Sequence, residues 1–324
     1  MSHPFLYRRA TSSDEAAQLL GEPGAVALGG GTDLLTAIAE EITLPDRLVD
    51  LRTIPGLDQI EVLGDETVRV GAAATIATLG SHPSIRERYA VLAQACDVVG
   101  TPALRNMGTI GGNLCQRPRC WYFRRAIPCL KNGGPSCPAV HGENRYLAIL
   151  NGGPCHVVHP SDPAVALVAL GARIEIAAVG GTREVPIADF FVLPSECIDR
   201  ETVLHPGEFV SAILLPPETA GGVQHYHKLM QREAWDFALA SVAACRDANG
   251  DVSLVLGGVA PRPWRVSSSV EEDVASGAAG AGLDDESIAA LAERALYDAV
   301  PLSKNGYKVE LAAALLRQAI RALV

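Results

Sequence analysis

Residues 101–162 read TPALRNMGTIGGNLCQRPRCWYFRRAIPCLKNGGPSCPAVHGENRYLAILNGGPCHVVHPSD. Near its front lies a glycine turn at residues 109–113, and at its end lies an acidic turn, His159-Pro160-Ser161-Asp162. Between the two turns lie five of the eight cysteines of the chain: Cys115, Cys120, Cys129, Cys137 and Cys155. Packing alone does not explain so many thiols between turns that allow close backbone approach. We interpret the stretch as a cofactor-binding turn interrupted by a metal-cluster loop.

The composition is that of an ordinary globular protein, with 48% apolar and 20% charged residues in a chain of 324. This length allows two domains, or one large domain with an appendage. A formal net charge of −10 argues against nucleic acids and anionic membranes as partners, because both require a basic surface. No apolar run approaches the ~20 residues of a membrane span.

The first residues of the chain carry no secretory pattern, so we expect a cytoplasmic protein. Export of the folded subunit on the signal of a partner is the alternative. In a reducing compartment, cysteines are thiols or metal ligands more often than disulfides.

A second glycine turn lies near the N-terminus. Ala25–Leu28 is predicted to be a buried strand, residues 29–33 read GGGTD, and helical periodicity resumes at residue 34. A strand, glycine turn and helix present backbone N–H groups and a positive helix end to a diphosphate. Neither G-x-G-x-x-G nor G-K-[ST] is present, and three glycines alone fit a tight turn equally well. The turn at residues 109–113 strengthens the prediction, because it offers a second approach to the same ligand.

The rest of the chain predicts an α+β fold in two domains. A capping box at Ser12 and Glu15 starts a helix, and hairpins are expected around residues 60–71 and 172–187. Residues 84–99 are expected to form one helix with Cys96 in the core. The composition changes near residue 218, which divides the chain into domains 1–218 and 219–324. The second domain is predicted to contain hairpin strands, a loop over 267–282, and helices over 284–299 and 308–323.

The spacing of the cysteines indicates what kind of metal they suit. Cys120, Cys129, Cys137 and Cys155 are nine, eight and eighteen residues apart. Structural zinc sites usually contain C-x₂₋₄-C pairs, which are absent here. Widely spaced thiolates in a slack loop suit a [4Fe–4S] cluster, and we place the loop at about residues 115–158. Cys115 remains a fifth candidate, and reduced thiols without metal remain the alternative to any cluster.

In combination, these motifs resemble a known family. They are similar to the motifs of the FAD-binding medium subunit of the molybdenum hydroxylases. The similar motifs are the first glycine turn, TIGGN, the cysteines around WYFR, HPSD, and the lysine in YHKLMQREAWDFALASVA. The resemblance covers nearly the whole chain. The cysteine loop narrows it to the iron–sulfur branch, which contains aldehyde oxidoreductase FAD subunits and the β subunit of 4-hydroxybenzoyl-CoA reductase. The implied fold is a two-subdomain FAD-binding domain of the PCMH/VAO type, followed by a small α+β domain with an antiparallel sheet and helices.

The resemblance implies a residue-level site. FAD would contact two loops. The first contains Ala27, Leu28, Gly29, Gly30, Gly31, Thr32, Asp33, Leu34 and Leu35, and the second contains Thr109, Gly111, Gly112 and Asn113. Asp162 would bind the ribityl hydroxyls, Val210 would offer its backbone from a strand, and Lys228 would lie near the flavin ring. The implied [4Fe–4S] ligands are Cys120, Cys129, Cys137 and Cys155, and Cys115 falls outside that pattern.

Each position also has a simpler explanation. Asp162 could cap the following helix, and Lys228 could be a solvated strand residue. Trp235 and Phe237 are expected in the core, and His225 and His227 at structural or surface positions.

The resemblance implies an electron-transfer subunit with no catalytic residue of its own for substrate oxidation. Its partners would be a large molybdenum-cofactor subunit and a small [2Fe–2S] subunit, in a heterotrimer that can dimerise. Electrons would pass through FAD to an external acceptor such as ferredoxin, quinone or oxygen. The alternatives are the 4-hydroxybenzoyl-CoA reductase β subunit, a self-sufficient FAD oxidase, and a zinc-stabilised binding protein.

Overall fold

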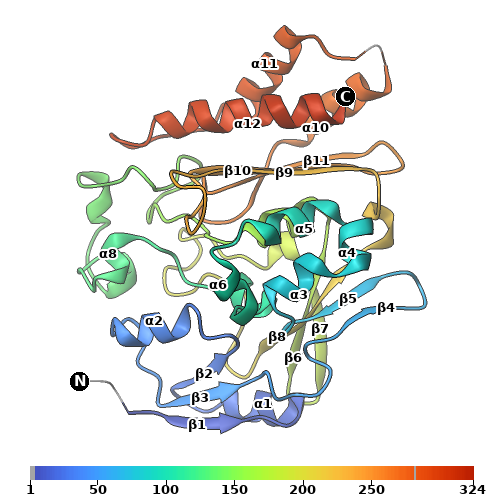
Figure 1. Cartoon of the computed structure of the whole chain (residues 1–324). Coiled ribbons are helices and arrows are strands. Elements are labelled where there is room, and N and C mark those ends of the chain that lie inside the picture. The colour runs from blue at the N-terminus through green and yellow to red at the C-terminus, as the bar shows by residue number, and fades with distance from the viewer. Residues whose placement is uncertain (1–3, 281) are drawn as a thin grey trace.

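The computed structural model describes residues 4–280 and 282–324. The N-terminal layer is a parallel sheet with strand order β1-β3-β2, seen at the bottom of Figure 1. Its strands and helices are β1 (Leu6–Arg9), α1 (Ser13–Leu20), β2 (Ala25–Leu28), α2 (Leu34–Ala39) and β3 (Arg47–Asp50). Ser12 caps α1 as predicted, since its Oγ accepts from the Glu15 N–H. The Glu15 carboxylate accepts from Thr11 instead of completing the box at Ser12.

The middle layer is an antiparallel sheet with strand order β4-β5-β8-β6-β7. Its strands are β4 (Ile60–Val62), β5 (Val68–Gly71), β6 (Arg173–Ala178), β7 (Gly181–Pro186) and β8 (Phe209–Leu215). The two predicted hairpins are therefore present. Helices between this sheet and the C-terminal domain are α3 (Ile76–Ser81), α4 (Pro83–Arg88), α5 (Ala90–Asp97), α6 (Pro102–Met107), α7 (Ile110–Leu114) and α9 (Asp162–Ala169).

The prediction of a single helix over residues 84–99 is wrong. The segment forms two helices, α4 and α5, separated at Tyr89, whose φ of −134° and ψ of 56° are not helical. Tyr89 is fully buried and donates its hydroxyl to the carbonyls of Leu215 and Pro216, so tertiary contacts hold the break. Cys96 is fully buried in the main core, as predicted.

The C-terminal layer is an antiparallel sheet with strand order β12-β11-β10-β9, covered on one face by helices (Figure 1). Its elements are β9 (Val223–Leu229), β10 (Ala240–Arg246), β11 (Val252–Gly257), β12 (Trp264–Arg265), α10 (Ser268–Ala279), α11 (Asp285–Arg294) and α12 (Tyr307–Leu323). With the two layers before it, this sheet completes the α+β fold, and that prediction is confirmed.

The prediction of a loop over residues 267–282 is wrong, because residues 268–279 form helix α10. Val270 and Val274 are one turn apart and fully buried against the sheet. Glu271 is buried beside them and accepts from Arg265 and the Leu254 N–H. Packing of this narrow apolar stripe, not local propensity, makes the helix.

The cysteine-rich segment has little regular structure, with only α8 (Trp121–Arg124) and two short 3₁₀ turns, Leu130–Asn132 and Pro138–Val140. The C-terminal domain holds it through Lys308 at the start of α12, which is fully buried and donates to the carbonyls of Tyr146, Leu147 and Gly258. No helix in the described part of the chain is long and apolar enough to cross a bilayer.

Candidate functional site

The two glycine turns lie against each other. The first follows β2 and the second caps α7, where the Thr109 Oγ1 accepts from the Gly112 N–H at 3.2 Å. A Cβ added at Gly29 would come within 2.5 Å of the Thr109 Oγ1, and one at Gly30 would overlap the Met107 carbonyl. Side chains at these positions would push the turns apart. The glycines therefore bring two sets of backbone N–H groups to one place.

A cavity of about 710 Å³ opens beside the two turns. Fourteen of the sixteen predicted FAD positions line it: Ala27, Gly29, Gly30, Gly31, Thr32, Asp33, Leu34, Thr109, Gly111, Gly112, Asn113, Asp162, Val210 and Lys228. Leu28 is buried at the end of its strand and Leu35 is exposed, and neither lines the cavity. The structure thus brings together segments more than 130 residues apart, in a volume typical of ligand sites.

The far wall of the cavity holds a buried ion pair. Lys228 Nζ on β9 lies 2.8 Å from Asp162 Oδ2 at the start of α9, and the Tyr226 hydroxyl donates to Asp162 Oδ1 at 2.7 Å. Burial raises the pKa of Asp162, and Lys228 and Tyr226 partly offset this by binding the charged form. Ser161, not Asp162, caps α9 through its Oγ. The simpler explanations for Asp162 and Lys228 therefore do not fit, since neither caps a helix nor is solvated.

His159 is buried two residues before that cap. Its Nδ1 accepts from the Ser161 N–H, and its Nε2 lies 3.4 Å from the Leu114 carbonyl on α7. Burial lowers the pKa of His159 to about 4. The imidazole is therefore neutral near pH 7, with the proton on Nε2, and it connects the acidic turn to the helix of the second glycine turn.

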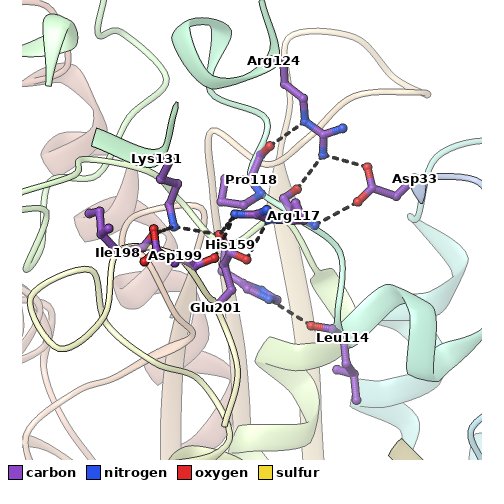
Figure 2. Close-up of polar contacts among 10 residues, drawn as sticks. All are labelled: Asp33, Leu114, Arg117, Pro118, Arg124, Lys131, His159, Ile198, Asp199 and Glu201. Carbon is purple, nitrogen blue, oxygen red and sulfur yellow. Dashed lines mark hydrogen bonds and ion pairs between the residues drawn. The ribbon is translucent and has the colours of Figure 1, made fainter. Parts of the chain in front are cut away.

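Asp33 connects the first glycine turn to the cysteine loop (Figure 2). Its carboxylate accepts from the Arg117 N–H at 2.9 Å and from Arg124 Nη2 at 2.7 Å, and it pairs with Arg119 Nη1 at 2.8 Å. Arg124 also donates to the Pro118 and Arg117 carbonyls. Asp33 is thus turned toward the loop and holds its first residues.

A second carboxylate anchors the same loop farther along. Glu201 pairs with Lys131 Nζ at 2.7 Å and accepts from Arg117 Nη2 at 3.1 Å. The Lys131 side chain is only 1% exposed and also donates to the Ile198 carbonyl. Two carboxylates thus hold the loop from opposite sides.

The four predicted cluster cysteines pack together. Cys120, Cys129 and Cys155 are buried in one small apolar cluster with Phe123 and Leu147, and Cys137 packs against it. All eight cysteines lie in the described part of the chain and are free. Burial raises the pKa of Cys120, and it raises that of Cys155 to about 12 although Lys131 lies near. Without a bound cation the Cys120 and Cys155 thiols would therefore remain protonated.

Among the residues that the structure describes, no group of three or more His, Cys, Asp and Glu side chains could hold a single metal ion. A four-iron cluster spreads its ligand sulfurs over a larger core than one ion does, so the arrangement does not contradict it.

Several residues that line the cavity were not predicted there. Cys115 faces the cavity and packs with the main core, apart from the other four thiols. Trp235 and Phe237 were expected in the core, but they are 63% and 47% exposed and border the cavity. That prediction was wrong, because the segment between β9 and β10 lies at the mouth of the cavity instead of under the sheet. The run of polar residues around them, QREAWD, was the available signal.

Family models match both parts of the chain. Residues 3–218 match the FAD binding domain in molybdopterin dehydrogenase, and residues 225–323 match the CO dehydrogenase flavoprotein C-terminal domain. The chain is 40% identical over 270 residues to the aldehyde oxidoreductase FAD-binding subunit PaoB of Escherichia coli K12, covering 82% of this chain and 84% of that protein. It is 28% identical to the carbon monoxide dehydrogenase medium chain of Hydrogenophaga pseudoflava, covering 98% and 96% of the two chains.

A solved structure of carbon monoxide dehydrogenase from Hydrogenophaga pseudoflava superimposes with a TM-score of 0.73 at 26% identity, covering 100% of this chain and 98% of that one. The fold of the chain is therefore that of a known medium subunit. The chain belongs to the family of FAD-binding medium subunits of the molybdenum hydroxylases.

Proposed function

We propose that this chain is the FAD- and [4Fe–4S]-containing electron-transfer subunit of a heterotrimeric molybdenum-cofactor oxidoreductase of the aldehyde oxidoreductase type. The observation that carries the proposal is the position of three buried thiols and the half-buried Cys137 in a loop that ion pairs join to the cavity between the glycine turns. The PaoB protein, at 40% identity, supports the aldehyde oxidoreductase type. A large molybdenum subunit and a small [2Fe–2S] subunit would be the partners, and we place the complex in the cytoplasm.

FAD fits the cavity on local grounds. The two glycine turns form a cradle that a Cβ would fill, and residues at the N-terminal ends of α2 and α7 line the cavity. Asp162 can accept from ribityl hydroxyls while Lys228 holds it, and Val210 offers backbone from β8. Bound FAD would supply two-electron and one-electron chemistry, and these residues would orient it.

The cysteine loop fits a [4Fe–4S] cluster in ligand number and surroundings. Four thiols supply the expected ligands, and apolar residues shield Cys120, Cys129 and Cys155 from water. Lys131, Arg119 and Arg124 lie in the same loop and would offset part of the negative charge of thiolates and cluster. Such a cluster would supply one-electron transfer close to the flavin.

Anaerobic purification of the complex, with iron and flavin measured per chain, tests the proposal. We expect about four iron atoms in this subunit and one FAD, and Cys129→Ser should remove the iron. The matched control is Cys197→Ser, a half-buried free thiol outside the predicted ligand set. Flavin without iron in the unmodified subunit would refute the cluster and leave a flavoprotein subunit. Full aldehyde oxidation by this chain without partners would favour the self-sufficient oxidase instead.

A further inference from the structure

Asp162, at the wall of the cavity beside the glycine turns, is held by side chains from the other domain. Asp162 begins α9 in the part of the chain that matches the FAD binding domain, whereas Tyr226 and Lys228 lie on β9 in the part that matches the C-terminal domain. The Tyr226 hydroxyl donates to Asp162 Oδ1 at 2.7 Å, and Lys228 Nζ donates to Asp162 Oδ2 at 2.8 Å. Each carboxylate oxygen therefore has one donor, and both donors cross the domain boundary.

Strand β9 places both donors at the carboxylate. Residues two apart on a strand point to the same face, which puts the Tyr226 and Lys228 side chains next to each other. β9 is an edge strand of its sheet, and the backbone N–H of Tyr226 donates to Gln94 Oε1 on α5 at 2.7 Å. Lys228 Nζ also donates to the carbonyl of Val98, at the end of α5, at 3.1 Å. Helix α5 thus fixes the strand that carries the two donors.

The Asp162 carboxylate needs these donors because it is buried. Burial raises the pKa of Asp162, whereas Lys228 and Tyr226 lower it by binding the charged form. Burial and the charge of Asp162 raise the pKa of Tyr226 well above its ordinary value, so its hydroxyl stays protonated and remains a donor. Loss of the Tyr226 hydroxyl would therefore shift Asp162 toward the neutral acid.

Tyr226 acts on the cavity only through Asp162. Asp162 and Lys228 line the cavity, and Tyr226 is not among the residues of the described chain that do so. A carboxylate has about four acceptor positions, so the two donors leave Asp162 able to accept from a ligand. An ionised carboxylate accepts stronger hydrogen bonds from hydroxyl groups than a neutral acid does.

We propose that Tyr226 is a positioning residue of the FAD site, which keeps Asp162 ionised and oriented to accept from the ribityl hydroxyls. The proposal rests on the proposed function, since it takes FAD as the ligand of the cavity. The glycine turns belong to the first domain, and Tyr226 and Lys228 complete the site from the second.

Other titratable and charged groups around Asp162 are the same in every variant that tests the proposal. They come from α5, the turn before α9, the cysteine loop and the segment after β9, and they are Cys96, His159, Arg119 and Asp236. Burial raises the pKa of Cys96 and lowers that of His159 to about 4, so both stay neutral between about pH 6 and pH 9. The ratio of FAD dissociation constants between a variant and the unmodified protein therefore reports on Asp162.

FAD affinity as a function of pH tests the proposal on the purified complex. FAD is removed, and its rebinding is measured by flavin fluorescence between about pH 6 and pH 9. Tyr226→Phe removes only the hydroxyl that donates to Asp162. The matched control is Tyr89→Phe, which removes the hydroxyl of another buried tyrosine that donates to the Leu215 and Pro216 carbonyls, away from the cavity.

We expect Tyr226→Phe to raise the FAD dissociation constant about tenfold at about pH 6. The difference should shrink toward about pH 9, because Asp162 is then ionised in both proteins. Tyr89→Phe should bind FAD as the unmodified complex does at every pH. In an Asp162→Asn background, which has no carboxylate to titrate, Tyr226→Phe should no longer change the pH dependence.

Infrared difference spectra provide a measurement that requires neither bound FAD nor activity. A protonated carboxylic acid gives a carbonyl band, which Asp162→Asn would remove, and Tyr226→Phe should make that band appear at higher pH. If Tyr226→Phe folds poorly, a ring-fluorinated tyrosine at position 226 keeps the ring and donates more strongly. It should move the Asp162 band to lower pH.

Two results would overturn the proposal. An FAD affinity of Tyr226→Phe that is unchanged, or reduced equally at every pH, would make Tyr226 a packing residue only. An Asp162 band at the same pH with and without the Tyr226 hydroxyl would show that Tyr226 does not act on the carboxylate. If the unmodified complex rebinds no FAD, the proposed flavin site fails instead, and the infrared band alone decides whether Tyr226 acts on Asp162.

Discussion

The cavity beside the glycine turns, which we propose as the flavin cavity, and the cysteine loop are neighbours, but they are held in different ways. Turns between strands and helices form the flavin cavity, and its key positions are glycines whose backbone approaches another backbone. The cysteine loop has little regular structure, and its two anchoring carboxylates, Asp33 and Glu201, are supplied by other segments. Sheet and helix packing therefore forms the first site in advance. The proposed cluster site depends on ion pairs between the loop and those two carboxylates.

Gly30→Ala should produce the largest effect, on the flavin side only. The added Cβ would overlap the Met107 carbonyl, which is backbone and cannot rotate away. We expect FAD content to fall at least about tenfold, with the iron content unchanged, as measured by absorbance and metal analysis. Gly64→Ala is the control, because a Cβ there meets no atom within 4 Å. Equal FAD in both variants would contradict the role of the close turns.

Arg124→Gln should act on the loop side. The variant leaves the Asp33 carboxylate with one guanidinium fewer and the Pro118 carbonyl without its donor. Because the Arg124 side chain is only 10% exposed, we expect a loss of about 3 kcal/mol in unfolding free energy and reduced iron content. Chemical denaturation and iron analysis measure the two effects.

Arg125→Gln is the matched control for that change. Arg125 is exposed and contacts the Trp121 ring at 5.5 Å, so its removal should cost less than about 0.5 kcal/mol. Similar losses in both variants would mean that the ion pair with Asp33 does not hold the loop.

His159 lies between the two regions and should make their packing sensitive to acid. Its pKa of about 4 is below the unfolded value, so the unfolded chain binds more protons between pH 4 and 6.5. Stability from this group is complete above pH 6.5, and about 2 kcal/mol is lost at pH 5. Between pH 7 and pH 5, the unfolding free energy of His159→Gln should fall by about 2 kcal/mol less than that of the unmodified protein, as measured by urea titrations. Identical losses would show that His159 is already charged in the folded chain.

Cys115→Ala should have the smallest effect. Cys115 lines the flavin cavity and packs with the main core, so we expect unchanged iron and a stability loss of about 1 kcal/mol. Iron analysis beside Cys129→Ser distinguishes the two cysteines. Loss of iron from Cys115→Ala would make it a fifth ligand candidate again.

The sequence alone determined much of this protein, because its local signals agree with the final fold. The two glycine turns and the strand before the first of them were predicted from short motifs, while Asp162 and Lys228 were singled out through the family resemblance. Such motifs work where the backbone itself sets the requirement, as at Gly30, since a glycine needed for close approach needs no distant partner to be recognised. The alternation of apolar residues likewise predicted both hairpins of the middle sheet.

Only the tertiary structure decided the features that depend on distant partners. Asp33 looked like a phosphate-loop residue, yet its carboxylate holds Arg119 and Arg124 in the cysteine loop. Helix α10 forms because Val270 and Val274 pack against an apolar surface. The break at Tyr89 is held by hydrogen bonds to the distant carbonyls of Leu215 and Pro216. Long-range packing and ion pairs outweigh weak local propensities, and spacing along the chain does not encode them.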